Sequence, residues 1–319
     1  MSGPIVCVGA GRMGRGIALA YALAGESVVV LDFKRRDAPA YEELKADNEA
    51  EIAATLADLV ALAHLDEPAA ATSARRIRFA PLADADELLA GAAIVYEGVP
   101  ETRPAKLDAL TRIGELVADR VLIASTTSTM LATELAPLVP RPERFLNAHW
   151  LNPAYLIPLV ELSVHPGTAE WARDRLRDSL TGIGKVPVVL GASPGFIVPR
   201  LQALVMNEAA RMAAEGVASP AEIDRATRYG LGFRFAALGV LEFIDFGGND
   251  ILYHANRYLA EQVDRDRYAL PPVIEEHMRT GRNGLRDGRG FYEYDPGQRA
   301  AYRRDVLART LAMLKNFPD

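Results

Sequence analysis

Short apolar runs alternate with amphipathic stretches through the first 190 residues of the chain. The stretches at residues 12–25, 104–118 and 169–184 carry apolar side chains at the three- and four-residue spacing of a helix that buries one face. Seven runs are typical of buried strands: "PIVCVG", "SVVVLD", "AAIVYEG", "RVLIAS", "RFLNAH", "PLVELS" and "VPVVL". Strands that alternate with helices predict an α/β fold built on a mostly parallel, doubly wound sheet.

The pattern changes after Phe196, where no convincing strand follows and several helices come in succession. Helical patterns cover residues 197–217, 219–230, 249–265, 271–280 and 298–316. We therefore predict a Rossmann-type domain over residues 1–192 and an all-helical domain over residues 193–319. All-helical second domains often bury their apolar faces against another subunit, so we expect a homodimer formed through these helices.

The composition narrows the possible partners. A net charge of -6 provides no basic surface for nucleic acid or for an anionic membrane. No apolar run approaches the roughly 18 residues that span a bilayer, and no signal peptide is apparent, so we expect a cytoplasmic protein with a small-molecule substrate. The single cysteine, Cys7, lies inside the apolar run "IVCV" and is predicted to be a buried strand residue rather than a reactive thiol.

The first strand runs into a glycine-rich turn. Gly9, Gly11 and Gly14 follow in G-x-G-x-x-G order and open a helix, and the second strand ends in Asp32. In this arrangement the first glycine permits a tight turn, the second lets the backbone approach a pyrophosphate, and the third lets the helix pack on the strand. The helix N-terminus favours the charge of the diphosphate. The pattern predicts a dinucleotide site that also includes Met13.

The end of the second strand bears on the choice of dinucleotide. The Asp32 carboxylate can accept hydrogen bonds from both ribose hydroxyls and would repel a 2′-phosphate. Lys34, Arg35 and Arg36 follow directly and could pair with that phosphate, so NADP stays a weaker alternative to NAD.

A histidine and a glutamate suggest the chemistry. Hydride transfer from an alcohol needs a base for the hydroxyl proton, and a neutral imidazole suits that role when a carboxylate fixes its tautomer. His149 ends one predicted strand and Glu161 lies on the next, so the two can face each other across a turn. Ser128 follows the strand "RVLIAS", at the sheet edge where ligands bind, and its hydroxyl can bond the substrate oxygen. We predict no metal site.

Seven motifs carry a resemblance that covers nearly the whole chain. They are "VGAGRMGRGIA", "YEGVPE" with Lys106, "ASTTSTM", "HWLNP", "PLVEL", "SPGFIVPRL" and "GRGFYEY". In this order they resemble the 3-hydroxyacyl-CoA dehydrogenase family, in particular 3-hydroxybutyryl-CoA dehydrogenases, with features of its lambda-crystallin, gulonate and carnitine dehydrogenase relatives.

The resemblance assigns roles to particular positions. It implies that His149 is the base, Glu161 its carboxylate partner and Ser128 a substrate contact. It also implies that Glu101 and Lys106 lie beside the nicotinamide half of the cofactor, and that the helical second domain dimerises.

Three features depart from the family or bear on the substrate. The family places an asparagine where this chain has Pro199, so one orienting hydrogen bond is missing or comes from elsewhere, with Asn152 and Asn207 as speculative replacements. The stretch 40–67, which in the family supplies contacts to coenzyme A, carries eight acidic residues and one lysine here; a solvated helix face would explain it equally well. Arg234 matches an arginine of relatives that oxidise free 3-hydroxy acids and could hold a carboxylate, or it could be a surface or interface residue.

The sequence thus predicts NAD-dependent interconversion of an L-3-hydroxyacyl group and its 3-oxo form. A short-chain thioester such as 3-hydroxybutyryl-CoA is the first choice of substrate, and a free 3-hydroxy acid held by Arg234 is the alternative. A lysine-base β-hydroxyacid dehydrogenase fits less well because a His–Glu pair occupies the reacting position. A purely structural role like that of a lens crystallin is disfavoured because base, partner and serine are all present.

Overall fold

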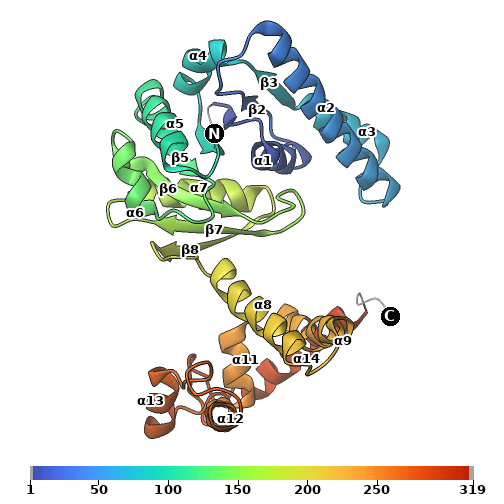
Figure 1. The fold of residues 1–319 in the computed structure, drawn as a ribbon, viewed down its shortest axis with the longest axis vertical. Helices are drawn as coiled ribbons and strands as arrows, with labels where there is room; N and C mark the ends of the chain where they lie inside the picture. Colours follow the sequence, from blue (N-terminus) through green and yellow to red (C-terminus); the bar gives the residue numbers. More distant parts are fainter. Residues whose placement is uncertain (1–2, 316–319) are drawn as a thin grey trace. The chain divides into compact units, whose positions relative to one another are not determined.

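The computed structural model describes residues 3–315 and contains one eight-stranded sheet. The strand order is β3-β2-β1-β4-β5-β6-β7-β8, and every neighbouring pair is parallel except β6 and β7 (Figure 1). The strands are β1 (Ile5–Val8), β2 (Val28–Leu31), β3 (Ile77–Ala80), β4 (Ile94–Glu97), β5 (Leu122–Ser125), β6 (Phe145–Trp150), β7 (Leu159–Val164) and β8 (Val186–Gly191). The first six strands have the order of a doubly wound dinucleotide-binding sheet, which confirms the predicted fold class.

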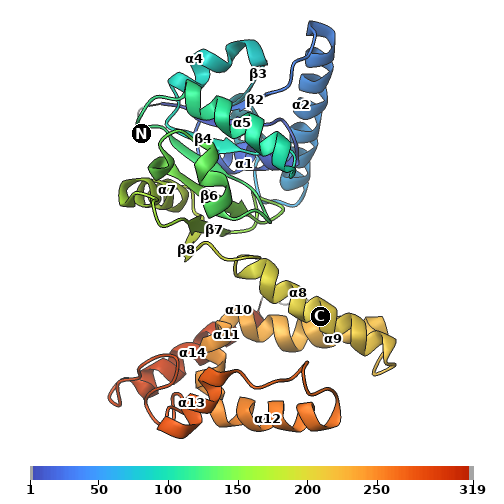
Figure 2. The same cartoon turned by 60° about the vertical axis from the view of Figure 1, so that its left-hand side comes forward.

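Helices cover both faces of the sheet (Figures 1 and 2). Side chains of α1 and α7 pack with the strands in one apolar core, and side chains of α4, α5 and α6 do so in a second core on the opposite face. Helices α2 and α3 contribute to a smaller cluster with α1. The helices are α1 (Arg12–Leu23), α2 (Ala38–Ala61), α3 (Glu67–Arg75), α4 (Ala85–Ala90), α5 (Arg103–Leu116), α6 (Ala132–Leu135) and α7 (Glu170–Gly182). Short 3-10 turns lie at Leu82–Asp84, Ala136–Leu138 and Pro142–Arg144.

The strand interiors are apolar because both faces of the sheet are covered. All four residues of β1, β4 and β5 are buried, as expected for parallel strands that lie between two helical layers. Cys7 in β1 is fully buried, as predicted, and burial raises the pKa of its thiol. At the carboxyl edge of the sheet Gly9 follows β1 and Asp32 follows β2, while Glu97 and Ser125 are the last residues of β4 and β5.

The chain divides into two compact units, one ending at Leu204 and the other beginning at Val205, within helix α8 (Val198–Ala214). The boundary predicted at residues 192 and 193 lies before this helix. The second unit continues with α9 (Pro220–Ala226), a π-helical turn (Thr227–Gly232), α10 (Phe233–Ala237), α11 (Val240–Gly247), α12 (Asn249–Gln262), α13 (Pro272–Thr280) and α14 (Arg299–Leu314).

A buried carboxylate organises the second unit. Asp245 on α11 accepts hydrogen bonds from the backbone nitrogens of Phe291 and Tyr292 and from the Tyr294 hydroxyl, so it holds the "GRGFYEY" segment. Beyond β8, the described part of the chain has isolated β-bridges but no further strand, which agrees with the predicted all-helical domain. Every helix of residues 3–315 is too short or too polar to cross a membrane.

Candidate active site

A cleft of about 500 Å³ opens beside the glycine-rich turn and the ends of β1, β2 and β4. Gly9 has a φ of +107°, which side-chain-bearing residues rarely adopt, and a Cβ atom on Gly14 would lie 2.1 Å from the Gly9 carbonyl oxygen. At Gly11 there is open space instead, so a ligand can approach the backbone. The cleft is lined by Gly9, Ala10, Gly11, Asp32, Phe33, Lys34, Arg36, Leu44, Gly98, Val99, Pro100, Ala105, Asp108 and Ala109. The residues present therefore fit a dinucleotide. Met13 lies against the core beneath the turn.

Asp32 stands in the cleft, but its carboxylate is engaged. Its Oδ2 accepts a 2.7 Å hydrogen bond from Arg36 Nε, and the side chain is nearly buried. When a ribose binds here, its hydroxyl groups would replace Arg36 as hydrogen-bond donors to the Asp32 carboxylate. Lys34, Arg35 and Arg36 line an adjoining cleft of about 430 Å³ together with Asp32. The basic residues that could pair with the 2′-phosphate of NADP therefore lie next to Asp32.

Replacing Asp32 with alanine is expected to weaken NAD binding about 10- to 100-fold, because hydrogen bonds to a charged acceptor are lost. Loss of Asp32 also releases Arg36 from its ion pair, so the difference between the affinities for NAD and NADP should become smaller. Titration of NADH and NADPH by fluorescence measures both. Asp37→Ala is the matched control, since Asp37 is an exposed carboxylate that caps α2 outside the cleft. A loss of helical signal in Asp32→Ala would show instead that Asp32 is structural.

His149 and Glu161 meet on the antiparallel pair β6–β7. The two residues are register partners, so their side chains lie on the same face of the sheet. His149 Nδ1 lies 2.8 Å from Glu161 Oε2, and both side chains are buried. The other ring nitrogen, Nε2, makes no hydrogen bond with any residue of the described chain. The proximity predicted from the sequence is thus present, and one ring nitrogen is left to act on a proton.

The second carboxylate oxygen of Glu161 holds the start of helix α8. Oε1 accepts hydrogen bonds from the backbone nitrogens of Ile197 (2.8 Å) and Val198 (2.9 Å). Burial alone would raise the pKa of Glu161, but the hydrogen bonds from His149 and from these two amides outweigh it and lower the pKa below the ordinary value. Glu161 is therefore a carboxylate, the form that fixes the imidazole tautomer and stabilises an imidazolium.

A phenylalanine covers the imidazole. Phe196 stacks on His149 with ring centroids 5.0 Å apart and ring planes 11° from parallel. Its φ of +48° is left-handed, an uncommon state for a residue with a bulky side chain. The turn that precedes α8 thus places an apolar ring on the predicted base.

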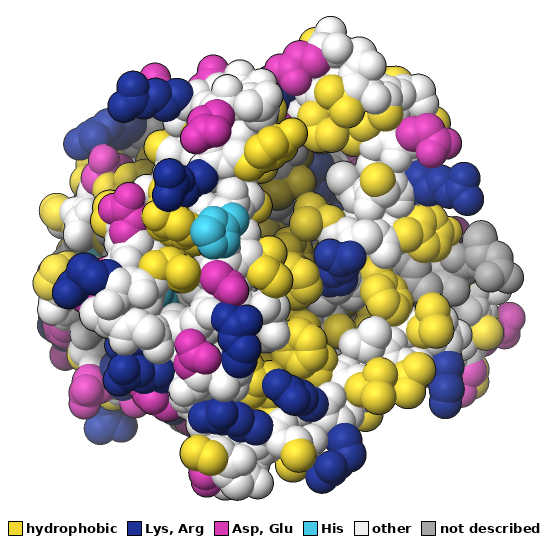
Figure 3. All heavy atoms as spheres, turned by 90° about the horizontal axis from the view of Figure 1, so that it is seen from below, with side chains coloured by type: hydrophobic (Ala, Val, Ile, Leu, Met, Phe, Trp, Pro, Cys, Tyr) yellow, Lys and Arg dark blue, Asp and Glu magenta, His cyan; other side chains and the backbone are white. Residues whose placement is uncertain are grey.

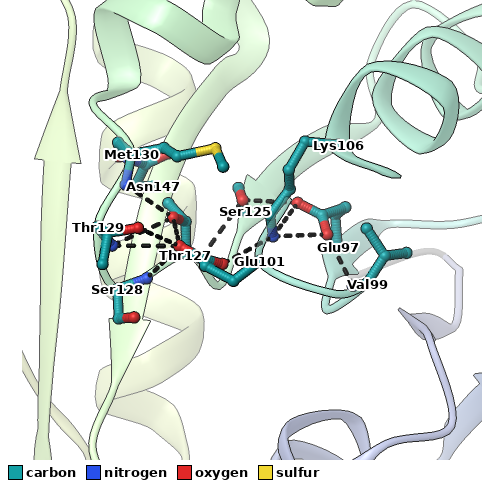
Figure 4. A network of polar contacts seen from close by, with 10 residues as sticks. All are labelled: Glu97, Val99, Glu101, Lys106, Ser125, Thr127, Ser128, Thr129, Met130 and Asn147. Atoms are coloured by element: carbon teal, nitrogen blue, oxygen red, sulfur yellow. Dashed lines mark hydrogen bonds and ion pairs between the residues drawn. The ribbon is translucent and has the colours of Figure 1, made fainter. Parts of the chain in front are cut away.

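Ser128 lies in the loop after β5 and is exposed. Its backbone nitrogen donates a 3.1 Å hydrogen bond to Glu101 Oε1, while its hydroxyl bonds to no described residue (Figure 4). Glu101 reaches the loop from the turn after β4. Lys106, which the resemblance places beside the nicotinamide half of the cofactor, is 0% exposed, and its Nζ lies against Glu97 and Glu101. Its contact with a cofactor stays a prediction.

Asn152 lies in the loop between β6 and β7 and is exposed. Lys185, the residue directly before β8, stabilises this loop, because its Nζ donates to the carbonyl oxygens of Ala154 (2.7 Å) and Ile157 (2.9 Å). Pro199 lies in the first turn of α8, where the fold tolerates it as expected.

Arg234 belongs to the second compact unit. It lies on α10 and is exposed, with its guanidinium 5.6 Å from the centroid of the Phe243 ring. Asn207, the other speculative replacement for the family's asparagine, is exposed on α8 in that same unit.

Glu97, Phe196 and Lys185 are site residues that the sequence did not single out. Glu97 and Phe196 occur inside the quoted motifs "YEGVPE" and "SPGFIVPRL", so a signal was present. Lys185 has no such motif; its only signal in the sequence is a charged residue directly before the predicted strand "VPVVL". Within residues 3–315, no three His, Cys, Asp or Glu side chains are grouped to hold a metal ion.

The doubly wound sheet, the glycine-rich cleft and the histidine–carboxylate pair together define a dinucleotide-dependent dehydrogenase. The family model for the 3-hydroxyacyl-CoA dehydrogenase NAD binding domain matches residues 4–193, and that for the C-terminal domain matches residues 195–294. The chain belongs to this family. It is therefore an NAD-dependent oxidoreductase of the type that acts on CH–OH groups.

Individual relatives are similar over nearly their whole length. The 5-formyl-3-hydroxy-2-methylpyridine 4-carboxylate 5-dehydrogenase of Mesorhizobium japonicum is 30% identical over 97% of this chain and 96% of its own. The 3-hydroxybutyryl-CoA dehydrogenase of Bradyrhizobium diazoefficiens is 32% identical over 90% of this chain and 94% of its own. The crystal structure of a 3-hydroxyacyl-CoA dehydrogenase from Archaeoglobus fulgidus matches with a TM-score of 0.74 and 28% identity, over 98% of this chain and 99% of that one.

Proposed function

We propose that this enzyme interconverts a short-chain L-3-hydroxyacyl thioester, of the 3-hydroxybutyryl-CoA kind, and its 3-oxo form, with NAD rather than NADP. The observation that carries the reaction type is the buried His149–Glu161 pair with one free imidazole nitrogen. The thioester is supported by relatives such as the Bradyrhizobium enzyme, whose name specifies 3-hydroxybutyryl-CoA.

In the proposed reaction His149 Nε2 takes the proton of the substrate hydroxyl. NAD, when bound along the glycine-rich cleft, supplies the acceptor for the hydride that leaves the same carbon. Glu161 stays ionised and stabilises the positive charge that develops on the imidazole. The Ser128 hydroxyl donates to the substrate oxygen and orients it toward the base, while the Phe196 ring limits access of water to one face of the imidazole.

A free 3-hydroxy acid is the second candidate substrate. The Mesorhizobium relative is named for a carboxylate substrate, and it matches nearly the full length of this chain. Helix α2 carries exposed acids, Glu42 and Glu51 among them, which would repel the phosphates of coenzyme A. The exposed guanidinium of Arg234 has the shape to hold a carboxylate by two parallel hydrogen bonds.

NADH formation distinguishes these substrates. We expect purified enzyme to oxidise L-3-hydroxybutyryl-CoA, with free L-3-hydroxybutyrate, carnitine and gulonate tested in parallel. Activity on free acids alone would replace the thioester by the second candidate. In that case Arg234→Ala should raise KM for the acid at least tenfold, while Arg225→Ala, an exposed arginine on α9, should not. No turnover of any of them would refute the proposed function.

We also propose that the helices of the second unit form a homodimer. Large apolar side chains are exposed there, including Met206, Ile251, Tyr258 and Leu307. Figure 3 shows hydrophobic side chains exposed among basic and acidic ones on one face of the molecule. Sedimentation of the enzyme at micromolar concentration should give twice the mass of one chain, and a monomer would refute the dimer.

A further inference from the structure

Glu97 is a fully buried carboxylate that the proposed reaction does not use. It ends strand β4, and its register partner Ser125 ends β5. Its two oxygens accept hydrogen bonds from Lys106 Nζ (2.9 and 3.0 Å), Ser125 Oγ (2.6 Å) and the Val99 nitrogen (2.8 Å). Four hydrogen bonds from three donors fix this buried carboxylate to the carboxyl edge of the sheet (Figure 4).

Lys106 joins this anchor to a second carboxylate. Its Nζ is 0% exposed and lies 3.5 Å from Glu101 Oε2 as well as against Glu97. An ammonium taken out of water needs anionic partners, so the position of Lys106 depends on Glu97. The position of Lys106 in turn sets where Oε2 of Glu101 is held.

Glu101 then holds the backbone that carries Ser128. Its other oxygen, Oε1, accepts from the nitrogens of Ser128 (3.1 Å) and Thr129 (3.2 Å) and from Thr129 Oγ1 (2.8 Å), and it also contacts Thr127 Oγ1. One carboxylate oxygen of Glu101 thus faces Lys106, while the other accepts the hydrogen bonds from the loop that contains Ser128. Burial alone would raise the pKa of Glu101, but the Thr127 hydrogen bond and the charge of Lys106 lower it, so Glu101 is ionised.

We propose that Glu97 and Lys106 are positioning residues, which act through Glu101 to fix the backbone of Ser128 and so the direction of its hydroxyl. The contacts lead from Glu97 at the end of β4 to Lys106, from Lys106 to Glu101, and from Glu101 to the backbone of Ser128 in the loop after β5. This gives Lys106 a role different from the direct cofactor contact that the family resemblance implies. The proposal rests on the proposed function in one respect, the contact between Ser128 and substrate.

A double-mutant cycle between Glu97 and Ser128 tests the coupling. Glu97→Gln keeps the shape but removes the charge that holds Lys106, and we expect it to lower kcat/KM about 10- to 100-fold in the wild-type background. In the Ser128→Ala background the same change should lower kcat/KM less than about threefold, because the group that it positions is already gone. Glu97→Asp keeps the charge and serves in the same cycle if the glutamine variant does not fold.

Hydrogen exchange provides a measurement without turnover. The amides of Ser128 and Thr129 should exchange at least tenfold faster in Glu97→Gln and in Lys106→Gln, while the dissociation constant of NADH changes less than about twofold. Arg144→Met is the control. Arg144 is a buried cation bonded to the carbonyl oxygens of Ala118 and Gly114, just before β6 and at the opposite edge of the sheet.

The outcomes separate the possibilities. Effects of Glu97→Gln that add fully to those of Ser128→Ala, or an exchange rate at residues 127–129 that does not change, would overturn the proposal. Weakened NADH binding with unchanged exchange would make Lys106 a cofactor contact instead. Wild-type enzyme without turnover on any substrate would refute the proposed function, while the exchange measurement would still decide whether Glu97 orders the loop.

Discussion

His149→Gln is expected to lower turnover about 10³- to 10⁴-fold and to leave NADH binding within about twofold of the wild-type value. Glutamine fills a similar volume and can still bond Glu161, but its amide cannot accept a proton near neutral pH. The hydroxyl proton of the substrate would then have to leave to water. Because His149 does not line the glycine-rich cleft, binding of the cofactor should be unaffected.

Steady-state kinetics and NADH fluorescence titration measure the two quantities separately. His165→Gln is the matched control, because His165 is also a buried histidine, just after β7, yet both its ring nitrogens are engaged with backbone groups. That variant should lose stability rather than turnover per folded molecule. Unchanged turnover in His149→Gln would remove His149 as the base.

Much of the sheet domain could be predicted because local patterns decide it. Seven of the eight strands follow from apolar runs, and the glycine turn follows from a motif with a strand before it and a helix after it. Strand β3 was missed because its four residues, "IRFA", contain a charged arginine and form the sheet edge, where only one neighbour constrains the pattern. Helices α10 and α11 were missed because they are only five and eight residues long and are separated by a break that contains a glycine, too short for a clear helical period.

The proximity of His149 to Glu161 could be predicted since the two strands are joined by one short loop, whereas other contacts of the site depend on strand order. Glu97 and Ser125 are 28 residues apart and meet only because β4 and β5 are neighbours in register. Glu161 meets the nitrogens of Ile197 and Val198 only because α8 begins beside β7. No periodicity along the chain carries such information.

Glu161→Gln should lower turnover about 10²- to 10⁴-fold, because the neutral amide no longer stabilises an imidazolium on His149. An isosteric amide also cannot keep both sets of hydrogen bonds with the same imidazole tautomer. If its oxygen accepts from His149, its NH₂ group faces the N–H groups of Ile197 and Val198. In the reverse orientation its neutral oxygen is a weaker acceptor for those two amides, and its NH₂ group donates to His149 Nδ1, which leaves the ring proton on Nε2 and removes the base. We therefore expect faster hydrogen exchange at the start of α8 together with the kinetic loss.

The pH dependence of stability gives an independent check on the same variant. The folded-state pKa of Glu161 is lowered, so its contribution to the free energy of unfolding is fully present above the unfolded-state pKa of about 4.3 and is lost as pH falls through the folded-state pKa. The stability difference between wild type and Glu161→Gln should thus be largest near neutral pH and shrink in acid. Asp66→Asn, which alters a carboxylate that caps α3, is the control for loss of a helix-capping charge and should leave turnover intact. A Glu161→Gln enzyme with wild-type turnover would show that the carboxylate only holds α8 in place, and that His149 works without a charged partner.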